Sequence, residues 1–422
     1  MNILLLIVCY IFYALFDIRG LAVLITMSLF TYAGGYLIHS SLLRGENGRA
    51  KMLCSMFVTT QIGVLCYFKY FCHTLPVGIS FYMLMAVSFL ADCTRGCFDV
   101  LPSLTEVMIF ISFFPTILSG PIQKAREFIP QINSRKHISS DRLTKGIWLI
   151  AIGLFMKLCM ADRLCIAVDK VYATPLVYSG ATLFMTSIAY SLQLLFDFAG
   201  YSKMAVGVAT ILGFDLAPNF DLPYMSTNPS AFWSRWHISL SSWLREYVYI
   251  PLGGNRKGSM RTYINILLVM IISGLWHGST VNFLIWGLGH GTGQMIHRKV
   301  CGKRKDAQSS SGIRILSMTV NFLFVNFLWI PFRVPTVSDT VTVLKRIFTL
   351  APGVSYFYVY TFIFGAMLLI VQFIGARYFD GHDPLKPLPL NRMYAKIIFC
   401  TLIIATAMFA YFGNSAFIYA KF

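Results

Sequence analysis

The residue of this sequence best suited to acid–base chemistry is a histidine in an apolar stretch. His277 lies in "MIISGLWHGSTVNFLIWGLGHG", behind a mostly apolar run and next to Gly274, Gly278 and Ser279. Ionisable groups within hydrocarbon are costly and usually face a cavity or the interior of a helix bundle. Burial favours the neutral imidazole, which can accept a proton from a hydroxyl nucleophile. We therefore expect His277 to act as a general base. The alternative is a packing histidine that is hydrogen-bonded within the bundle.

A second group of candidates lies in "FWSRWHISLSSWLREYVYIPLGGNR" (232–256), which is unusually polar for this chain. Its aromatic and aliphatic residues alternate with polar ones too densely for a spanning helix, so we expect an interfacial or re-entrant helix that ends at Gly253 and Gly254. The cationic groups can meet the phosphates of an anionic donor. Alternatively, the stretch is an interfacial anchor that holds lipid headgroups. The candidates are His237 as a second catalytic residue, Arg235, Arg245, Asn255 and Arg256 for donor binding, and Glu246 in support.

Asp197 is a carboxylate at the end of the apolar run in "SLQLLFDFAGYSKMAVG". Such a group is costly in hydrocarbon unless it is paired. We expect an arginine or histidine partner, either as structural support or to orient a catalytic group. We expect neither a metal site nor a bound cofactor: the ten cysteines carry no zinc pattern, and the remaining histidines lack metal-ligand spacing. Among those histidines only His290 is kept open as a functional candidate.

The elements that must position these residues are helices in a membrane. Apolar residues make up 57 % and charged residues 12 % of the 422 residues, against roughly 25 % charged in soluble domains. Because a spanning helix needs about 20 mostly apolar residues, we expect an all-α polytopic protein of about 11 spans plus re-entrant or interfacial helices, in one domain over residues 1–422. The first segment is expected to be a helix and not a cleaved signal peptide. The expected spans are 3–17, 21–38, 52–71, 76–91, 146–161, 180–198, 261–276, 280–297, 314–332, 356–376 and 394–413.

The basic residues predict how the chain crosses the membrane. The net charge of +18 comes from lysines and arginines in short loops between spans, as the positive-inside rule expects, so no nucleic-acid partner is expected. Loops 39–51, 120–145 and 298–314 should face the cytoplasm. For loop 120–145 to do so, the apolar segment 105–119 must be re-entrant, which is tolerated where protein surrounds it. The residues that break this segment are Pro115, Gly120 and Pro121.

Several segments, in order and over most of the chain, resemble the membrane-bound O-acyltransferase family. Within it they are similar to a bacterial branch that contains the alginate O-acetylation membrane protein, peptidoglycan-acetylating relatives and the membrane subunit for D-alanylation of teichoic acid. The run "YIPLGGNRKG" is similar to the alginate and peptidoglycan members, although from "MNILLLIVCYIFYALFDIRG" we expect an early hydrophobic segment common in alginate-type members to be missing. The segments are "LPVGISFYMLMAVSFLADCTRG", "FFPTILSGPIQKAREFIPQI", "FDFAGYSKMAVGVATILGFDLAPNFDLPYMS", "FWSRWHISLSSWLREYVYIPLGGNRKG", "GLWHGSTVNFLIWGLGHG" and "FIYAKF".

The resemblance implies roles for individual residues. The histidine of the "LWHG" motif, His277, would be the essential catalytic residue, with Trp276 in support. The "RWH" histidine, His237, would lie on the cytoplasmic side of a central tunnel through the protein. The polar stretch 232–256 would then form the floor of that tunnel, where a water-soluble donor meets a site embedded in lipid.

The resemblance also implies a function. A multi-pass protein of the bacterial cytoplasmic membrane would take an acyl group, with acetyl-CoA as the expected donor, and pass it to a cell-surface polysaccharide. An extracytoplasmic partner of the SGNH-hydrolase type is expected because the chain shows no soluble domain for a polymer. The enzyme alternative is D-alanyl transfer from an acyl carrier protein to teichoic acid. The alternative of another class is a transporter with a His277 and Asp197 proton relay, although the internal repeats often seen in transporters are not found.

Overall fold

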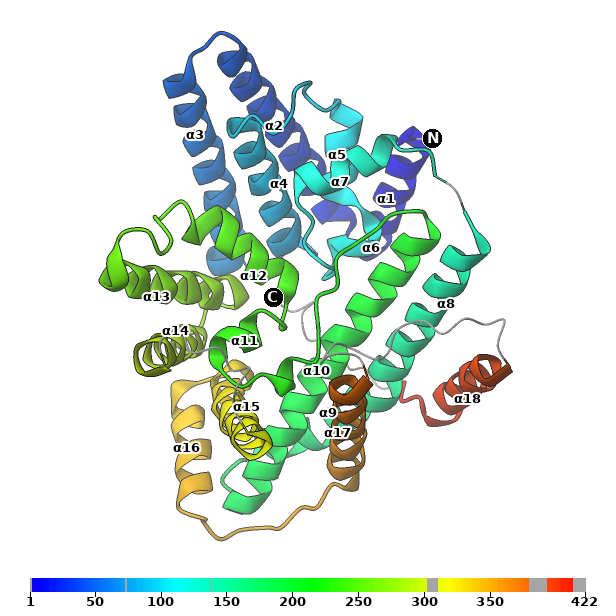
Figure 1. Cartoon of the computed structure of the whole chain (residues 1–422), viewed down its shortest axis with the longest axis vertical. Coiled ribbons are helices and arrows are strands. Elements are labelled where there is room, and N and C mark those ends of the chain that lie inside the picture. Colours follow the sequence, from blue (N-terminus) through cyan, green and yellow to red (C-terminus); the bar gives the residue numbers. More distant parts are fainter. Residues whose placement is uncertain (1, 73, 137, 302–309, 379–392, 413–422) are drawn as a thin grey trace. The chain divides into compact units, whose positions relative to one another are not determined.

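The computed structural model describes residues 2–72, 74–136, 138–301, 310–378 and 393–412 (Figure 1). Within these ranges all regular elements are helices, and the β-structure is limited to two isolated bridges. The chain forms two compact units: Met1–Leu143 with Val208–Ala217, and Thr144–Gly207 with Pro218–Lys421. The all-helical class is confirmed. The expected single domain over residues 1–422 stays a prediction.

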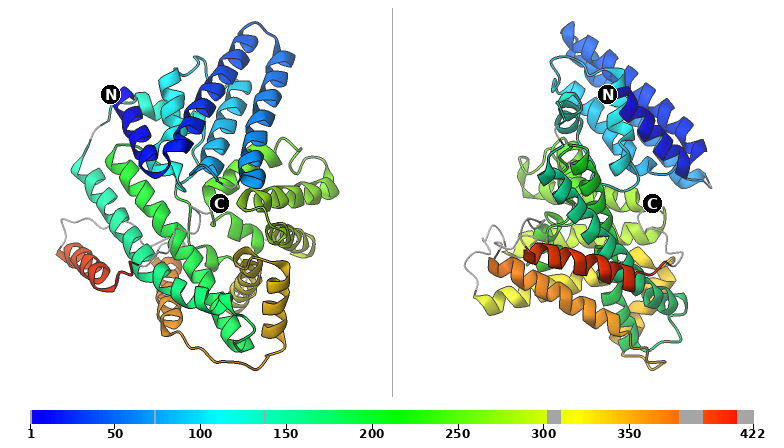
Figure 2. Two further views of the ribbon diagram at one scale, coloured as in Figure 1. Left: turned by 180° about the vertical axis from the view of Figure 1, so that it is seen from behind. Right: turned by 90° about the vertical axis from the view of Figure 1, so that its right-hand side faces the viewer.

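The first unit contains three apolar helices that pack side by side, α2, α3 and α4 (Figures 1 and 2). Asp17 caps α2, because its carboxylate accepts a hydrogen bond from Gly20 N at 2.7 Å. The same carboxylate also accepts from Val77 N at 3.1 Å, in the segment before α4. Helix α4 begins after Gly78, which has φ 71°, a conformation that glycine adopts without a steric penalty. The helices of this unit are α1 (Asn2–Phe16), α2 (Ile18–Leu43), α3 (Asn47–Cys66) with the π-helix η1 (Tyr67–Phe71), α4 (Ile79–Thr94), α5 (Leu104–Ser112), α6 (Phe114–Ile117) and α7 (Ala125–Asn133).

The segment predicted to break between residues 105 and 119 is interrupted. Helix α5 ends at Ser112, Phe113 adopts φ −55° and ψ 106°, and α6 carries Pro115 in its first turn. Nine and four residues are both well short of the roughly 20 that a spanning helix needs. The interruption is confirmed, and the re-entrant course through a membrane stays a prediction.

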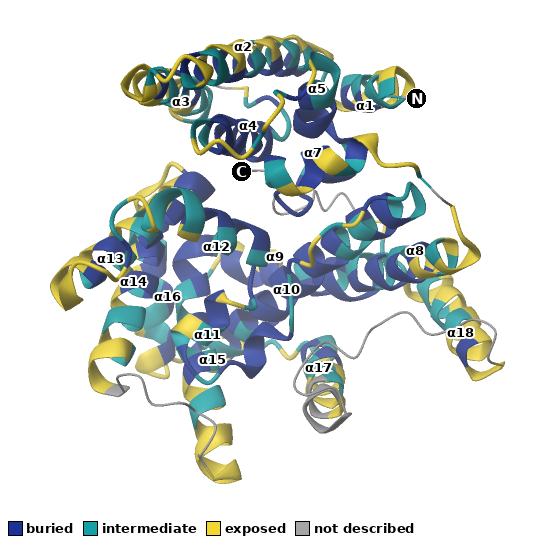
Figure 3. Ribbon diagram, turned by 45° about the horizontal axis from the view of Figure 1, so that its top comes forward, coloured by how far each residue is buried: buried dark blue, intermediate teal, exposed yellow. Residues whose placement is uncertain are grey.

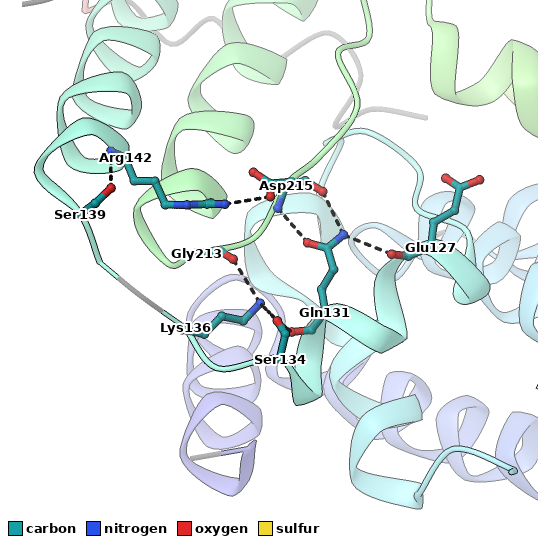
Figure 4. Close-up of polar contacts among 8 residues, drawn as sticks. All are labelled: Glu127, Gln131, Ser134, Lys136, Ser139, Arg142, Gly213 and Asp215. Carbon is teal, nitrogen blue, oxygen red and sulfur yellow. Dashed lines mark hydrogen bonds and ion pairs between the residues drawn. The ribbon is translucent and has the colours of Figure 1, made fainter.

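A polar cluster holds the basic loop after α7 in place (Figure 4). The Gln131 side chain accepts from Asp215 N at 2.8 Å and donates to Asp215 O at 3.1 Å. Arg142 pairs with the Asp215 carboxylate at 2.9 Å, and Lys136 Nζ donates to Gly213 O at 3.1 Å. Two of the basic residues expected at the cytoplasmic face therefore fasten the loop to the segment that follows α10.

The second unit contains the candidate catalytic residues. Its long helix α10 is buried along most of its length, whereas α18 is largely exposed (Figure 3). The helices are α8 (Ser140–Leu154) with η2 (Phe155–Ala161), α9 (Asp162–Ala173), α10 (Gly180–Ile211), η3 (Pro223–Met225), α11 (Pro229–Trp233), α12 (Ile238–Leu244) with η4 (Arg245–Tyr249), α13 (Gly258–His277), α14 (Val281–Cys301), α15 (Ser311–Arg333), α16 (Val337–Phe348), α17 (Val359–Tyr378) and α18 (Met393–Phe409).

Glycines let α13 and α14 approach closely. A Cβ atom on Gly274 would lie 2.3 Å from Phe283 O, and one on Gly287 would lie 2.4 Å from Met270 O. Small residues at such contacts are a common way for helices to pair within a membrane. The close contact holds His277, the last residue of α13, against α14.

All eleven expected spans coincide with helices of the structure. Five helical stretches among the described residues are long and apolar enough to cross a membrane: Ile18–Leu43, Asn47–Phe71, Gly180–Ile211, Gly258–His277 and Ser311–Arg333. Several others, including α1, α4 and α18, are apolar but shorter. The polytopic class is supported, and the count of about 11 spans stays a prediction.

Candidate active site

A short antiparallel pairing fixes the backbone on both sides of His237. Phe220 forms an isolated bridge with Trp236. Ile238 N then donates to Asn219 O at 2.9 Å. The loop that follows α10 thus holds the turn between α11 and α12, which contains His237.

His237 itself has a left-handed backbone, with φ 45° and ψ 54°. A non-glycine residue in this region costs on the order of 1–3 kcal/mol, and such residues cluster at active sites and ligand clamps. The side chain is fully buried, and burial lowers the pKa of His237 to about 3. The imidazole is therefore neutral at pH 7 and able to accept a proton.

Both candidate histidines lie close to one tryptophan. The ring centroid of Trp276 is 6.2 Å from that of His237 and 4.8 Å from that of His277. Phe198 of α10 covers His237 edge-on at 4.6 Å. His237 and His277 are 0 % and 2 % exposed, so the structure brings both predicted catalytic residues into one buried aromatic cluster.

His277 is enclosed by aromatic rings from two further helices. Trp286 of α14 and Phe332 of α15 lie 5.1 Å and 5.3 Å from its ring, both steeply inclined to it. A Cβ atom on Gly278 would lie 2.0 Å from the Phe283 ring, so the residue after His277 must be glycine for this ring to stay in place. Gly274 and Gly278 therefore allow close packing around His277.

His290 is the residue of this region that the sequence left unassigned. Its ring is fully buried and lies 4.9 Å from Trp286 and 5.0 Å from Trp233. Neither ring nitrogen has a hydrogen-bond partner among the described residues. The feature of the sequence that points to His290 is its place in "GLGHG", one helix after His277. A histidine in an apolar helix has to face the protein interior.

The candidate donor-binding residues lie further out. Arg235 is half-buried and its guanidinium is 3.5 Å from Asp221 O, while Glu246 of η4 is half-buried. Arg245, Asn255 and Arg256 are exposed. Helical structure is present in the expected stretch as α12 and η4, and the Gly253–Gly254 turn that follows has φ values of 104° and 56°; its interfacial or re-entrant position stays a prediction. In this stretch the polar residues Arg245, Asn255 and Arg256 are therefore at the surface, whereas His237 is buried.

Asp197 has a lysine partner, whereas the sequence led us to expect an arginine or a histidine. Asp197 and Asp162 each lie 2.7 Å from Lys157 Nζ, so this ammonium helps to neutralise the buried carboxylate. Lys157 belongs to the π-helix η2 between α8 and α9; a π-bulge of this kind often marks a functional position in a helix. Lys157 lies within the expected apolar span 146–161, so nothing in the sequence marked it as the partner of Asp197.

The buried aromatic cluster lies in a region that matches a known protein family. Residues 7–338, which include His237, Trp276 and His277, match the family described as membrane-bound O-acyltransferase. A probable alginate O-acetylase of Pseudomonas syringae pv. tomato is 35 % identical over 354 residues, 79 % of this chain and 67 % of that protein. A peptidoglycan O-acetyltransferase of Helicobacter pylori is 31 % identical over 378 residues, 79 % of this chain and 71 % of that protein.

A third relative is named for a different transfer reaction. A teichoic acid D-alanyltransferase of Bacillus subtilis is 33 % identical over 265 residues, 60 % of this chain and 67 % of that protein. The resemblance drawn from the motifs is confirmed, and the protein is an acyltransferase with the apolar helices of a multi-pass membrane protein. The chain belongs to the membrane-bound O-acyltransferase family.

Proposed function

We propose that this protein transfers an acetyl group from cytoplasmic acetyl-CoA to an acceptor outside the cytoplasmic membrane of a bacterium. The observation that carries the proposal is the pair of buried histidines close to Trp276, within a region similar to alginate and peptidoglycan O-acetylases. The acceptor would be a cell-surface polysaccharide, reached through an extracytoplasmic partner of the SGNH-hydrolase type.

In the proposed reaction His277 acts as the general base. It takes the proton of the acceptor hydroxyl while the hydroxyl oxygen forms a bond to the acetyl carbonyl carbon. The carbon–sulfur bond of the thioester then breaks, and coenzyme A leaves as a thiolate that takes up the proton. Burial among aromatic rings keeps water from competing with the acceptor hydroxyl. His237, which is part of the polar stretch 232–256, would help to admit or hold the donor.

The exposed arginines would receive the donor. Arg245 and Arg256 are exposed cations on the stretch that leads to His237, and charge-assisted contacts to phosphate are worth about 1.5–3 kcal/mol, or roughly 10- to 150-fold in affinity. Arg245→Gln and Arg256→Gln should therefore weaken acetyl-CoA binding to purified protein, measured by calorimetry. Exposed Lys145, on α8, provides Lys145→Gln as the control for loss of one charge. Donor affinity that is unchanged in folded arginine variants would instead favour an interfacial anchor.

A second candidate function is D-alanyl transfer from a carrier protein, favoured by the similarity to a teichoic acid D-alanyltransferase. The two are separated by offering purified protein radiolabelled acetyl-CoA or a radiolabelled D-alanyl carrier protein, each with and without a co-purified partner. We expect transfer or turnover with acetyl-CoA only. Turnover with the D-alanyl carrier protein alone would overturn the acetyl proposal and leave the acyltransferase assignment intact.

A further inference from the structure

The second unit contains a cavity that is separate from the buried histidines. Its volume is about 280 Å³, and its walls are almost entirely apolar. One wall is formed by α8 and η2, where Trp148, Ile152 and Met156 follow one another at four-residue spacing. Residues spaced in this way lie on one helix face, so this wall runs along the helix axis as a continuous strip.

A second wall is a matching strip on α10, which packs directly against α8 at Gly153 and Gly200. Leu195, Ala199 and Lys203 again lie four residues apart and line the cavity. Eight residues of helix at 1.5 Å per residue make this strip about 12 Å long. Lys203 is the one charged residue among the described residues that line the cavity, and it lies at the end of the strip. The cavity therefore has a long apolar part and a single cationic position.

Two outer helices complete the walls. Met367, Leu368 and Val371 of α17 and Ile398 and Leu402 of α18 line the cavity. Other apolar side chains of these two helices are exposed, among them Leu369, Ile370, Ile397 and Ile403. In a membrane protein such exposed side chains face hydrocarbon. The cavity is thus walled by helices that contact lipid on their other faces.

The cavity is divided from the candidate active site by aromatic rings. Phe220 lines the cavity, and its ring packs at 5.0 Å against Phe198, which covers His237. Neither His237 nor His277 lines the cavity. A molecule held there would not present its carbonyl carbon to either histidine, so the occupant is not the acyl group that is transferred.

We propose that this cavity binds one acyl chain of an anionic membrane phospholipid, with the lipid phosphate at Lys203. The apolar walls can accept an acyl chain from the bilayer without burying a polar group, and the ammonium of Lys203 carries the charge that attracts a phosphate. The lipid is a resident ligand of α8, α10, α17 and α18. The inference is independent of the proposed acetyl transfer, because it concerns a different set of residues and a different ligand.

The test uses the full chain purified in detergent, stripped of lipid and then offered defined probes. Native mass spectrometry would count molecules of phosphatidylglycerol, phosphatidylcholine and oleate that stay bound. The wild-type protein should retain one phosphatidylglycerol in preference to the other two probes. Lys203→Gln should weaken phosphatidylglycerol binding about tenfold or more, while Lys145→Gln, which removes an exposed lysine outside the cavity, should leave it unchanged.

A second variant tests the apolar part of the cavity. Ala199→Leu adds a branched side chain to the α10 strip and should reduce phosphatidylglycerol retention while Lys203 is intact. Gel filtration and thermal unfolding establish that each variant is folded. Equal retention of phosphatidylcholine, with no effect of Lys203→Gln, would overturn the headgroup assignment. Equal retention of oleate would make the ligand a fatty acid, and unchanged retention in Ala199→Leu would place the lipid elsewhere.

Discussion

At the scale of single residues, the sequence was most informative where a polar group interrupts an apolar run. His277 and Asp197 both stand out in this way, and both are buried in the structure. The lysine that pairs with Asp197 could not be predicted, because it lies 40 positions earlier in the chain and only the fold brings them together. The left-handed backbone of His237 was equally hidden, since it depends on pairing with the loop at Asn219.

The burial of His237 predicts a pH dependence of stability. Burial lowers the pKa of His237 from 6.5 to about 3. Between these values the unfolded chain binds a proton at this residue that the folded protein does not, so the free energy of unfolding falls as the pH drops from 6.5 towards 3. His237→Asn removes this titration, and asparagine tolerates the left-handed backbone. The Tm of wild-type protein should therefore fall more than that of His237→Asn between pH 7.5 and pH 5. An equal fall in Tm for the two proteins would contradict the lowered pKa of His237.

At the scale of helices, apolar length was a reliable guide, and all eleven expected segments are helical. Helices α7, α9 and α16 were not predicted, and they carry apolar residues on one face only. A search for continuous apolar runs does not detect such helices, because their apolar residues recur every three or four positions. The sequence shows glycines beside His277, but the close approach of α13 to α14 that they allow depends on the three-dimensional packing.

The α13–α14 contact predicts which glycines tolerate a methyl group. Gly274→Ala and Gly287→Ala would each place a Cβ atom within 2.4 Å of a backbone oxygen, and overpacking of this kind typically costs about 1–3 kcal/mol. Both variants should lower the Tm in detergent. The matched control is Gly63→Ala in α3, where the added Cβ meets nothing within 4 Å. A Tm of Gly274→Ala equal to that of Gly63→Ala would show that the helices can separate without cost.

At the scale of the whole molecule, family membership and apolar helices describe a multi-pass membrane acyltransferase. Motif order along the chain was sufficient to predict the family, since the motifs carry residues for both chemistry and packing. The number of spans could not be obtained in the same way. A helix of 15 or 16 residues, such as α1 or α4, is too short to cross an average bilayer by itself. Whether it spans the membrane depends on the neighbouring helices and on the local thickness of the bilayer.

The orientation of the whole chain can be tested at one exposed position. Ser134 lies at the end of α7 in the basic loop 120–145, which should face the cytoplasm. In a cysteine-free background, an impermeant thiol reagent should not label Ser134→Cys in intact cells, and should label it after the membrane is made permeable. Efficient labelling of intact cells would show that 105–119 crosses the membrane completely.

The central claim is that His277 is the base of an acyl transfer. The most direct measurement is the transfer of label from radiolabelled acetyl-CoA by purified protein, with its partner, for wild type and His277→Ala. Removal of a positioned general base typically costs about 10²–10⁴-fold in rate. His277→Ala should therefore lose transfer by this factor while it still inserts, purifies as one species and binds acetyl-CoA; His39→Ala, a half-buried histidine of α2, should keep normal transfer. Near-normal transfer by His277→Ala would contradict the account and leave His277 as a packing residue.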